Sequence, residues 1–337
     1  MNTLIKIALG VSMRLITNRV KFFLASSVFI ILLGCHSNPT EDAQQLNKNH
    51  PFSIVVLGNV QDGGSPHMGC EKKCCKDLFE KPDKNRMVVC LGIIDRKAKK
   101  SWIIEATPDY PRQAKLLKRY CRFTNNENPN GIFLTHAHIG HYSGLMYLGK
   151  EAMNSSNIPV YAMTRMKGFL IKNGPWSQLI KKSNVKIQNI DHQQQVRLSN
   201  NISIVPFLVP HRDEYSETVG YKINGPSKSA LFIPDIDKWS KWNSSIVDEI
   251  KNVDYAFIDA TFFDGQEINN RDISEIPHPF VIETMNTFKG LSIAERNKIH
   301  FIHMNHTNPL LDSSSAQTKQ VRSNGFNIAR PFQIINL

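Results

Sequence analysis

The sequence predicts an α/β layered fold, and three of its features support this class. Of the 337 residues, 41% are hydrophobic and 21% are charged, which is ordinary for a globular protein with a buried core. Short apolar runs typical of strands alternate along the chain with segments of helical spacing. No internal repeat or strong linker interrupts the chain after residue 50. Mixed strands with interspersed helices favour a layered α/β architecture, although periodicity alone does not choose among such folds.

Residues 1–34 are expected to be a secretory leader that is removed from the mature protein. Basic residues without any acid come first, and an apolar run from Phe22 to Leu33 follows. This order, ended by a small residue, is that of a secretory signal. The run is too short for a comfortable transmembrane helix, and an uncleaved anchor helix is the alternative.

The end of the leader and the residue after it read Leu32-Leu33-Gly34-Cys35, which resembles the lipobox of bacterial lipoproteins. The resemblance implies that Cys35 receives lipid and anchors the protein to a membrane. Residues 35–50 are polar and are expected to form a flexible tether, with the folded domain in residues 51–337. In lipoproteins, an Asp directly after the lipidated Cys favours retention in the inner membrane. Residue 36 of this chain is His and not Asp. The expected location is therefore the cell envelope, at the periplasmic face of the outer membrane.

The charge of the chain limits its partners. Removal of residues 1–34 would lower the formal net charge from +12 to about +8, because this segment carries four basic residues and no acid. A basic surface suits a small anionic substrate, an anionic lipid surface or nucleic acid. No run of Lys and Arg is interleaved with aromatic residues, so a dedicated nucleic-acid platform is not expected. The sequence leaves the oligomeric state open, with a homodimer as one alternative.

Hydrophobic patterns and the turn residues around them identify the expected elements. Met87–Ile94 and Ser101–Ala106 flank the polar turn Asp95–Lys100 and are predicted to form a hairpin. The other expected strands are Phe52–Gly58, Gly131–Thr135, Ile158–Ala162, Val185–Ile190, Val196–Leu198, Ile202–Val209, Val219–Ile223, Ala230–Ile233, Tyr255–Ile258 and, as the last one, His300–His303. The expected helices are Tyr110–Tyr120, Trp239–Ile250 and Phe280–Phe288.

Three histidines lie close together at the end of the expected strand Gly131–Thr135. The segment reads Thr135-His136-Ala137-His138-Ile139-Gly140-His141. Two His separated by one residue at a strand end can project onto one cation, and a third His three positions later can face a second cation. Neutral imidazole is a standard ligand for zinc and similar ions. A surface His cluster without function is the alternative, which the position after a strand makes the weaker hypothesis.

This segment resembles the H-x-H-x-D-H signature of the metallo-β-lactamase superfamily. The resemblance implies a four-layer αββα sandwich with a metal site at one edge of the sheets. It also implies that His211, Asp235 and His303, each at the end of an expected strand, complete the ligand set. One ion would be held by His136, His138, His211 and Asp235, and the other by His141, Asp235 and His303.

Gly140 departs from this signature, because the superfamily carries Asp at that position. The second ion is then expected to bind weakly, a mononuclear enzyme is an alternative, and Gly140→Asp is expected to tighten binding. If two ions are held tightly, another residue must supply the ligand, and Asp62 in a Gly-rich loop is the first candidate. Zinc is the expected metal, with iron or manganese as alternatives.

Three further segments resemble the pyrroloquinoline quinone biosynthesis protein B family. They are residues 58–66 with the Cys residues that follow, residues 104–109, and residues 303–309. The resemblance spans roughly residues 52–311. That family's own version of the His motif is depleted in His, whereas this chain carries all three. The chain therefore resembles a hydrolase-type relative rather than the cofactor-biosynthesis protein itself.

Two segments, residues 257–262 and Pro277-His278-Pro279, resemble parts of ribonuclease Z and cyclic phosphodiesterase relatives. In those relatives an acidic residue orients a His that serves as general acid for the leaving oxygen, and Asp259 and His278 fit these roles. A carboxylate beside a His fixes its tautomer and favours its protonated form. A structural loop His and a turn-capping Asp are the alternatives.

Of the six Cys, five remain if Cys35 is lipidated. Phosphodiesterase relatives carry a structural zinc bound by three Cys and a His. Cys70, Cys74, Cys75 and His306 would supply this set here. The adjacent pair Cys74-Cys75 departs from the usual spacing and would strain simultaneous ligation. A disulfide, which an oxidising compartment favours, is therefore the alternative.

These features predict a metal-dependent hydrolase that uses a metal-bound hydroxide, first of all on a phosphodiester. The pair Asp259 and His278 and the basic surface favour that substrate. Hydrolysis of a lactone, a β-lactam or a carboxylic ester is the second hypothesis. An iron-dependent oxygenase related to pyrroloquinoline quinone biosynthesis and a noncatalytic binder are the alternatives from other classes. Metal analysis and a test for turnover would separate them.

Overall fold

The strands of the described chain form two mixed sheets. The computed structural model describes residues 50–268 and 272–337, and within these each sheet has seven strands. The sheet orders are β14-β1-β2-β3-β4-β5-β6 and β13-β12-β11-β10-β9-β8-β7. The first sheet comprises β1 Phe52–Gly58, β2 Cys90–Asp95, β3 Lys100–Ile104, β4 Ile132–Phe133, β5 Ile158–Ala162, β6 Val185–Asn189 and β14 Ile334–Asn336. The second comprises β7 Val196–Arg197, β8 Ser203–Leu208, β9 Val219–Asn224, β10 Ser229–Ile233, β11 Tyr255–Asp259, β12 Ile299–Ile302 and β13 Asn327–Ile328.

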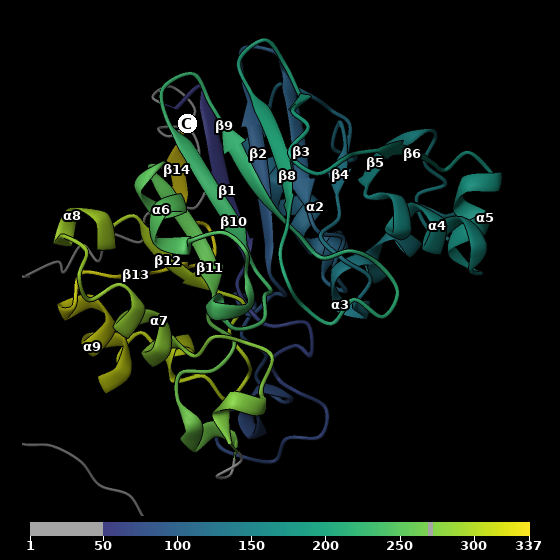
Figure 1. The fold of residues 1–337 in the computed structure, drawn as a ribbon. Helices are drawn as coiled ribbons and strands as arrows, with labels where there is room; N and C mark the ends of the chain where they lie inside the picture. Colours follow the sequence, from purple (N-terminus) through teal and green to yellow (C-terminus); the bar gives the residue numbers. More distant parts are fainter. Residues whose placement is uncertain (1–49, 269–271) are drawn as a thin grey trace, which may run out of the picture. The chain divides into compact units, whose positions relative to one another are not determined.

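Helices connect these strands and cover the outer faces of the sheets (Figure 1). The α-helices are α2 Tyr110–Tyr120, α3 Ile139–Tyr142, α4 Thr164–Lys172, α5 Trp176–Lys181, α6 Ile246–Lys251, α7 Val281–Thr287, α8 Ile293–Arg296 and α9 Ala316–Ser323. Short 3-10 turns occur at Lys76–Leu78, Ser143–Leu148, Trp239–Lys241, Gly265–Ile268, Ile273–Glu275 and Pro309–Leu311. None of the described helices is long and apolar enough to span a bilayer.

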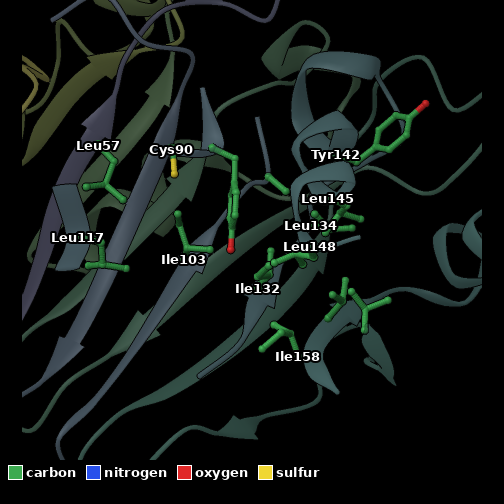
Figure 2. Close-up of a cluster of buried hydrophobic side chains, with 14 of the residues drawn as sticks. Leu57, Cys90, Ile103, Leu117, Ile132, Leu134, Tyr142, Leu145, Leu148 and Ile158 are labelled. Carbon is green, nitrogen blue, oxygen red and sulfur yellow. The ribbon is translucent and has the colours of Figure 1, made fainter. Parts of the chain in front are cut away.

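Three buried apolar clusters show that the layers stack helix, sheet, sheet, helix. Side chains alternate across a strand, so each strand contributes to two clusters. In β1, Val55 and Leu57 pack toward α2, whereas Ile54 and Val56 pack between the sheets. In β10, alternate residues pack between the sheets and against α6, α7 and α9. Figure 2 shows the first cluster, between the first sheet and its helices. This architecture confirms the predicted αββα sandwich.

Most expected elements are present with small shifts at their ends, but two expectations are wrong. The expected helix Trp239–Ile250 is divided into the 3-10 turn Trp239–Lys241 and α6. The division arises because the Ser245 side chain accepts a hydrogen bond from Asp248 N and starts a new helix there. His300–His303 was expected to end the series of strands, yet β13 and β14 follow it. Both are too short to carry a clear alternating pattern.

The carboxyl ends of several strands meet at one edge of the sandwich. Strands β10, β11 and β12 are parallel, as are β3, β4 and β5. Because parallel strands end at the same edge, residues that follow them lie near one another. The predicted leader and Cys35, together with the tether up to residue 49, lie outside the described residues and stay predictions.

Candidate metal centre

The structure brings together all the side chains that were expected to bind the catalytic metal. These side chains lie just after the carboxyl ends of four strands. The three His of the motif follow β4, His211 follows β8, Asp235 follows β10 and His303 follows β12. The register pairs Ile233 with Ile258 and Asp259 with Ile302. It therefore places Asp235, Asp259 and His303 side by side. The converging residues are His136, His138, His141, His211, Asp235 and His303.

The first group consists of His136, His138, His211 and Asp235, whose ligand atoms all lie within 4.8 Å of one another. Asp235 Oδ2 lies 3.3 Å from His136 Nε2, and Asp235 Oδ1 lies 3.1 Å from His211 Nε2. His138 Nδ1 lies 2.8 Å from His136 Nε2. Three imidazoles and one carboxylate focused on one point form a donor set typical of zinc.

The second group joins His141 and His303 with Asp62, again within 4.8 Å. Asp235 Oδ2 lies 3.7 Å from His141 Nε2 and 3.9 Å from His303 Nε2, so Asp235 stands between the two groups. His303 has a φ of +65°, in the left-handed region that non-glycine residues rarely adopt. Strain of this kind tends to occur at functional sites, where the surrounding structure compensates for it.

Residues around the cluster hold the rings in place. Glu105, at the end of β3, is fully buried and has a φ of +84°. Its Oε1 accepts a hydrogen bond from Thr135 Oγ1 at 2.5 Å and lies 3.3 Å from His141 Nδ1. On the outer side, Glu214 Oε2 lies 3.4 Å from His138 Nε2. Carboxylates behind a ligating imidazole fix its tautomer and orientation.

The sequence alone indicated no role for Glu105, Thr135 or Glu214. A signal for Glu105 was present, because an acid at the end of a buried strand beside the His-bearing strand is placed to reach it. Glu214 carried no such signal. Its approach to His138 depends on how the loop after β8 folds, where Ala137 N donates to Ser216 Oγ at 2.8 Å.

Asp259 and His278 form a buried pair next to this cluster. His278 Nδ1 lies 2.8 Å from Asp259 Oδ2 and 3.3 Å from Asp235 Oδ1. The loop that carries His278 is fixed because Val281 N donates to Phe262 O at 2.9 Å. Thr261 Oγ1 donates to Asp259 Oδ1 at 2.7 Å and lies 2.9 Å from His303 Nδ1. One carboxylate therefore orients His278 directly and His303 through Thr261, a link that the sequence did not reveal.

The charges of the site follow from its burial. Burial lowers the pKa of His136 well below its usual value and that of His211 to about 4, so both rings are neutral near pH 7. Burial raises the pKa of Asp235, but the neighbouring His charges outweigh it and hold that pKa well below its usual value. For His278, burial lowers the pKa, whereas the charges of Asp259 and Asp235 outweigh this and raise it to about 9.

Several buried polar atoms of the His/Asp cluster make no hydrogen bond, which bears on whether a cation fits between them. Among the described residues, both ring nitrogens of His141 and of His211, Asp235 Oδ1 and His303 Nε2 are buried without a contact of hydrogen-bond geometry, although Asp235 Oδ1 lies 3.1 Å from His211 Nε2 and Glu105 Oε1 lies 3.3 Å from His141 Nδ1. Each buried polar atom left unpaired costs about 1–3 kcal/mol, so their concentration at one point requires an explanation. A cation bound between them would satisfy several at once, and their nitrogen and oxygen chemistry suits a zinc-like ion.

The predicted structural site is brought together in part. Cys70, Cys74 and Cys75 place their sulfur atoms within 4.8 Å of one another, despite the adjacent pair. The Cys70 and Cys74 sulfurs are 3.6 Å apart and unbonded, farther than the roughly 2.05 Å of a disulfide. His306 lines a surface pocket together with His67 and Cys70. Its ring stacks on that of His67, with ring centroids 4.5 Å apart, and it does not join the group of three sulfur atoms.

Comparison with known proteins identifies the family of this fold and site. Residues 102–304 match the beta-lactamase superfamily domain. The chain belongs to the beta-lactamase superfamily. Among curated relatives, it is 22% identical over 303 residues to coenzyme PQQ synthesis protein B of Xanthomonas euvesicatoria, covering 82% of this chain and 97% of that protein. The protein of the same name from Acinetobacter baumannii is also 22% identical, over 301 residues, with the same coverage.

Solved structures of the superfamily share the fold. Zinc-bound PqqB from Methylobacterium extorquens superposes with a TM-score of 0.68 at 20% identity, covering 85% of this chain and 100% of that one. A diphosphatase of the PhnP family gives a TM-score of 0.59 at 19% identity, covering 84% and 96%. At such identities the likeness establishes the fold, whereas the chemistry depends on the residues of this chain.

The position of Gly140 corrects one expectation. A Cβ added to Gly140 would lie 2.0 Å from Asp62 Cβ, far inside contact distance. Gly140→Asp, which was expected simply to add a ligand, would instead collide with Asp62. The space that the superfamily signature fills from residue 140 is filled here from the Gly-rich loop.

Proposed function

We propose that the protein is a metal-dependent phosphodiester hydrolase. The observation that carries this proposal is the Asp259–His278 pair, at 2.8 Å, placed directly beside the His/Asp cluster. Cleavage of an unactivated ester requires both an attacking oxygen and a proton for the leaving oxygen. The cluster and the pair would divide these two tasks.

His136, His138, His211 and Asp235 would hold one ion, and His141 and His303 would face a second. When bound, zinc makes water nucleophilic near neutral pH and polarises the ester oxygen. Burial lowers the pKa of His136, His138 and His211, which keeps these three rings neutral and leaves a nitrogen lone pair for the ion. Zinc is the metal that we propose, because three imidazoles and one carboxylate converge on one point in the first group.

His278 would supply the proton. Its Nδ1 faces Asp259 and Asp235, so Nε2, on the opposite side of the ring, is the atom that can reach a substrate. The raised pKa of about 9 means that the ring carries a proton at neutral pH. Asp259 would fix the ring and stabilise its charged form. The structural likeness to a diphosphatase of the PhnP family supports a phosphate-centred reaction, and so does the formal charge of about +8 expected after removal of residues 1–34.

The test is a panel of substrates on protein whose metal content has been measured. Bis(p-nitrophenyl) phosphate should be hydrolysed by the zinc-loaded protein, and the rate should fall to background after chelation. A phosphomonoester, a lactone and a chromogenic β-lactam serve as comparison substrates. Preference for the lactone or the β-lactam would replace phosphodiester hydrolysis by the second hypothesis. Oxygen-dependent turnover with iron alone would overturn the assignment as a hydrolase.

A further inference from the structure

A side chain at residue 140 of the His motif and the Asp62 side chain of the Gly-rich loop would occupy the same space. Gly140 lies in α3, and a Cβ built there would lie 2.0 Å from Asp62 Cβ and 2.7 Å from Asp62 Cα. Contacts below 3.0 Å are essentially never seen for a Cβ, and backbone cannot move away as a flexible side chain can. Asp62 in its present place therefore requires glycine at residue 140.

Backbone pairing fixes Asp62 beside the metal cluster. Val60 forms parallel bridges with Val88 on one side and Met304 on the other. Gln61 N donates to Met304 O at 2.8 Å, and Met304 N donates to Asn59 O at 2.9 Å. Met304 directly follows His303, so the two loops run together up to the site. The chain then turns away at Gly64, whose φ of +79° suits glycine.

The Asp62 carboxylate lies beside the rings of His141 and His303. Its oxygen lies within 4.8 Å of ligand nitrogens of both His141 and His303. Within the described part of the chain, His141 Nε2 and His303 Nε2 are buried without a hydrogen bond, whereas His141 Nδ1 lies 3.3 Å from Glu105 Oε1. Gln61 Nε2 donates to Asp62 Oδ1 and so orients the carboxylate. One carboxylate and two imidazoles, with Asp235 Oδ2 beside both rings, would together offer four donor atoms to a zinc-like ion.

We propose that Asp62 replaces the missing aspartate of the H-x-H-x-D-H signature as a ligand of a second catalytic ion. The carboxylate has moved from residue 140 to a different loop, and glycine at residue 140 makes room for it. The site thus holds two ions rather than one. This inference rests on the proposed metal site. It adds that the Asp62 carboxylate compensates for the glycine at residue 140, where the signature has Asp.

Metal stoichiometry and thermal unfolding of the full domain test the exchange directly. The variants are Asp62→Ala, Gly140→Asp and the double variant Asp62→Ala/Gly140→Asp, with Asp77→Asn as a control at an exposed acid of the same region. Zinc per chain is measured after dialysis, and affinity by competition with a chelating dye. The zinc content of each variant is compared with that of wild type, because an ion at the Cys cluster would add the same amount of zinc to every variant.

Asp62→Ala should lose one zinc equivalent and keep the rest. Gly140→Asp alone should unfold at a lower temperature than wild type, because its new side chain overlaps Asp62. The double variant should regain both the lost zinc equivalent and the melting temperature, since it restores the superfamily arrangement. The Asp77→Asn control should match wild type in both measurements.

Unchanged zinc content and affinity in Asp62→Ala would overturn the proposal. So would Gly140→Asp with wild-type stability, or a double variant that remains one equivalent short. His136→Ala distinguishes this failure from that of the proposed function, because His136 belongs only to the first group. If His136→Ala loses an equivalent and Asp62→Ala does not, only the role of Asp62 is wrong. If neither loses any, the metal site itself is wrong.

Discussion

Replacing His278 tests the assignment of the general acid most directly. His278→Ala removes the imidazole whose Nδ1 lies 2.8 Å from Asp259 and leaves His136, His138, His211 and Asp235 in place. We expect metal content to be retained. The rate with an alkoxide leaving group should fall by roughly 10²- to 10⁴-fold, which is the usual value of general acid–base catalysis. This corresponds to about 3–5 kcal/mol of transition-state stabilisation.

The leaving group separates proton donation from other effects. A nitrophenolate departs without a proton, so the rate with bis(p-nitrophenyl) phosphate should fall much less than with a methyl or nucleoside ester. Both rates are measured as kcat/KM on the same metal-loaded preparations. The variant's sensitivity to leaving-group pKa should therefore be steeper than that of wild type.

His278→Asn is the matched control. Its amide nitrogen can donate to Asp259 as Nδ1 does, but it cannot protonate a leaving group. If it behaves as His278→Ala does toward the alkoxide ester, the loss is chemical rather than structural. Equal losses on both esters in either variant, with metal retained, would refute the role as general acid and leave His278 a positioning residue.

Four further predictions follow from other parts of the chain. His136→Ala should lower metal content and abolish activity toward every substrate, as measured by metal analysis and the substrate panel; retained activity would contradict its role as a ligand. Cys70→Ser should remove one zinc equivalent and lower the melting temperature if the three Cys hold an ion, and mass spectrometry that finds a Cys70 disulfide would favour the alternative. Cys35→Ser should release the protein from membranes or leave an unprocessed precursor; palmitate labelling that survives this change would contradict lipidation. Burial raises the pKa of Glu267 from 4.5 to about 7, so the folded chain keeps a proton there that the unfolded chain loses. The stability that this proton contributes is complete below pH 4.5 and is lost as pH rises through 7, by up to about 3 kcal/mol. Chemical unfolding from pH 4 to 8 should show Glu267→Gln gaining stability relative to wild type over this window, and a constant difference would contradict the argument.

The sequence by itself determined most of the fold, because the signals involved are local. The strand β1 and the helix α2 have the predicted bounds, since alternation and helical spacing are properties of a short segment. The His motif was likewise readable, because its spacing after a strand determines where the rings point. The order of later strand-end residues then indicated His211, Asp235 and His303.

Only the tertiary structure decided how these candidate ligands are supported. Glu105 meets His141, and Glu214 meets His138, because β-sheet register and loop packing bring distant segments together. The clearest case is Asp62, which the sequence indicated only as a candidate ligand. Whether its carboxylate fills the place left by Gly140 depends on the pairing of Val60 and Gln61 with Met304. Such pairing is set by contacts between segments far apart in the chain, and no local pattern records it.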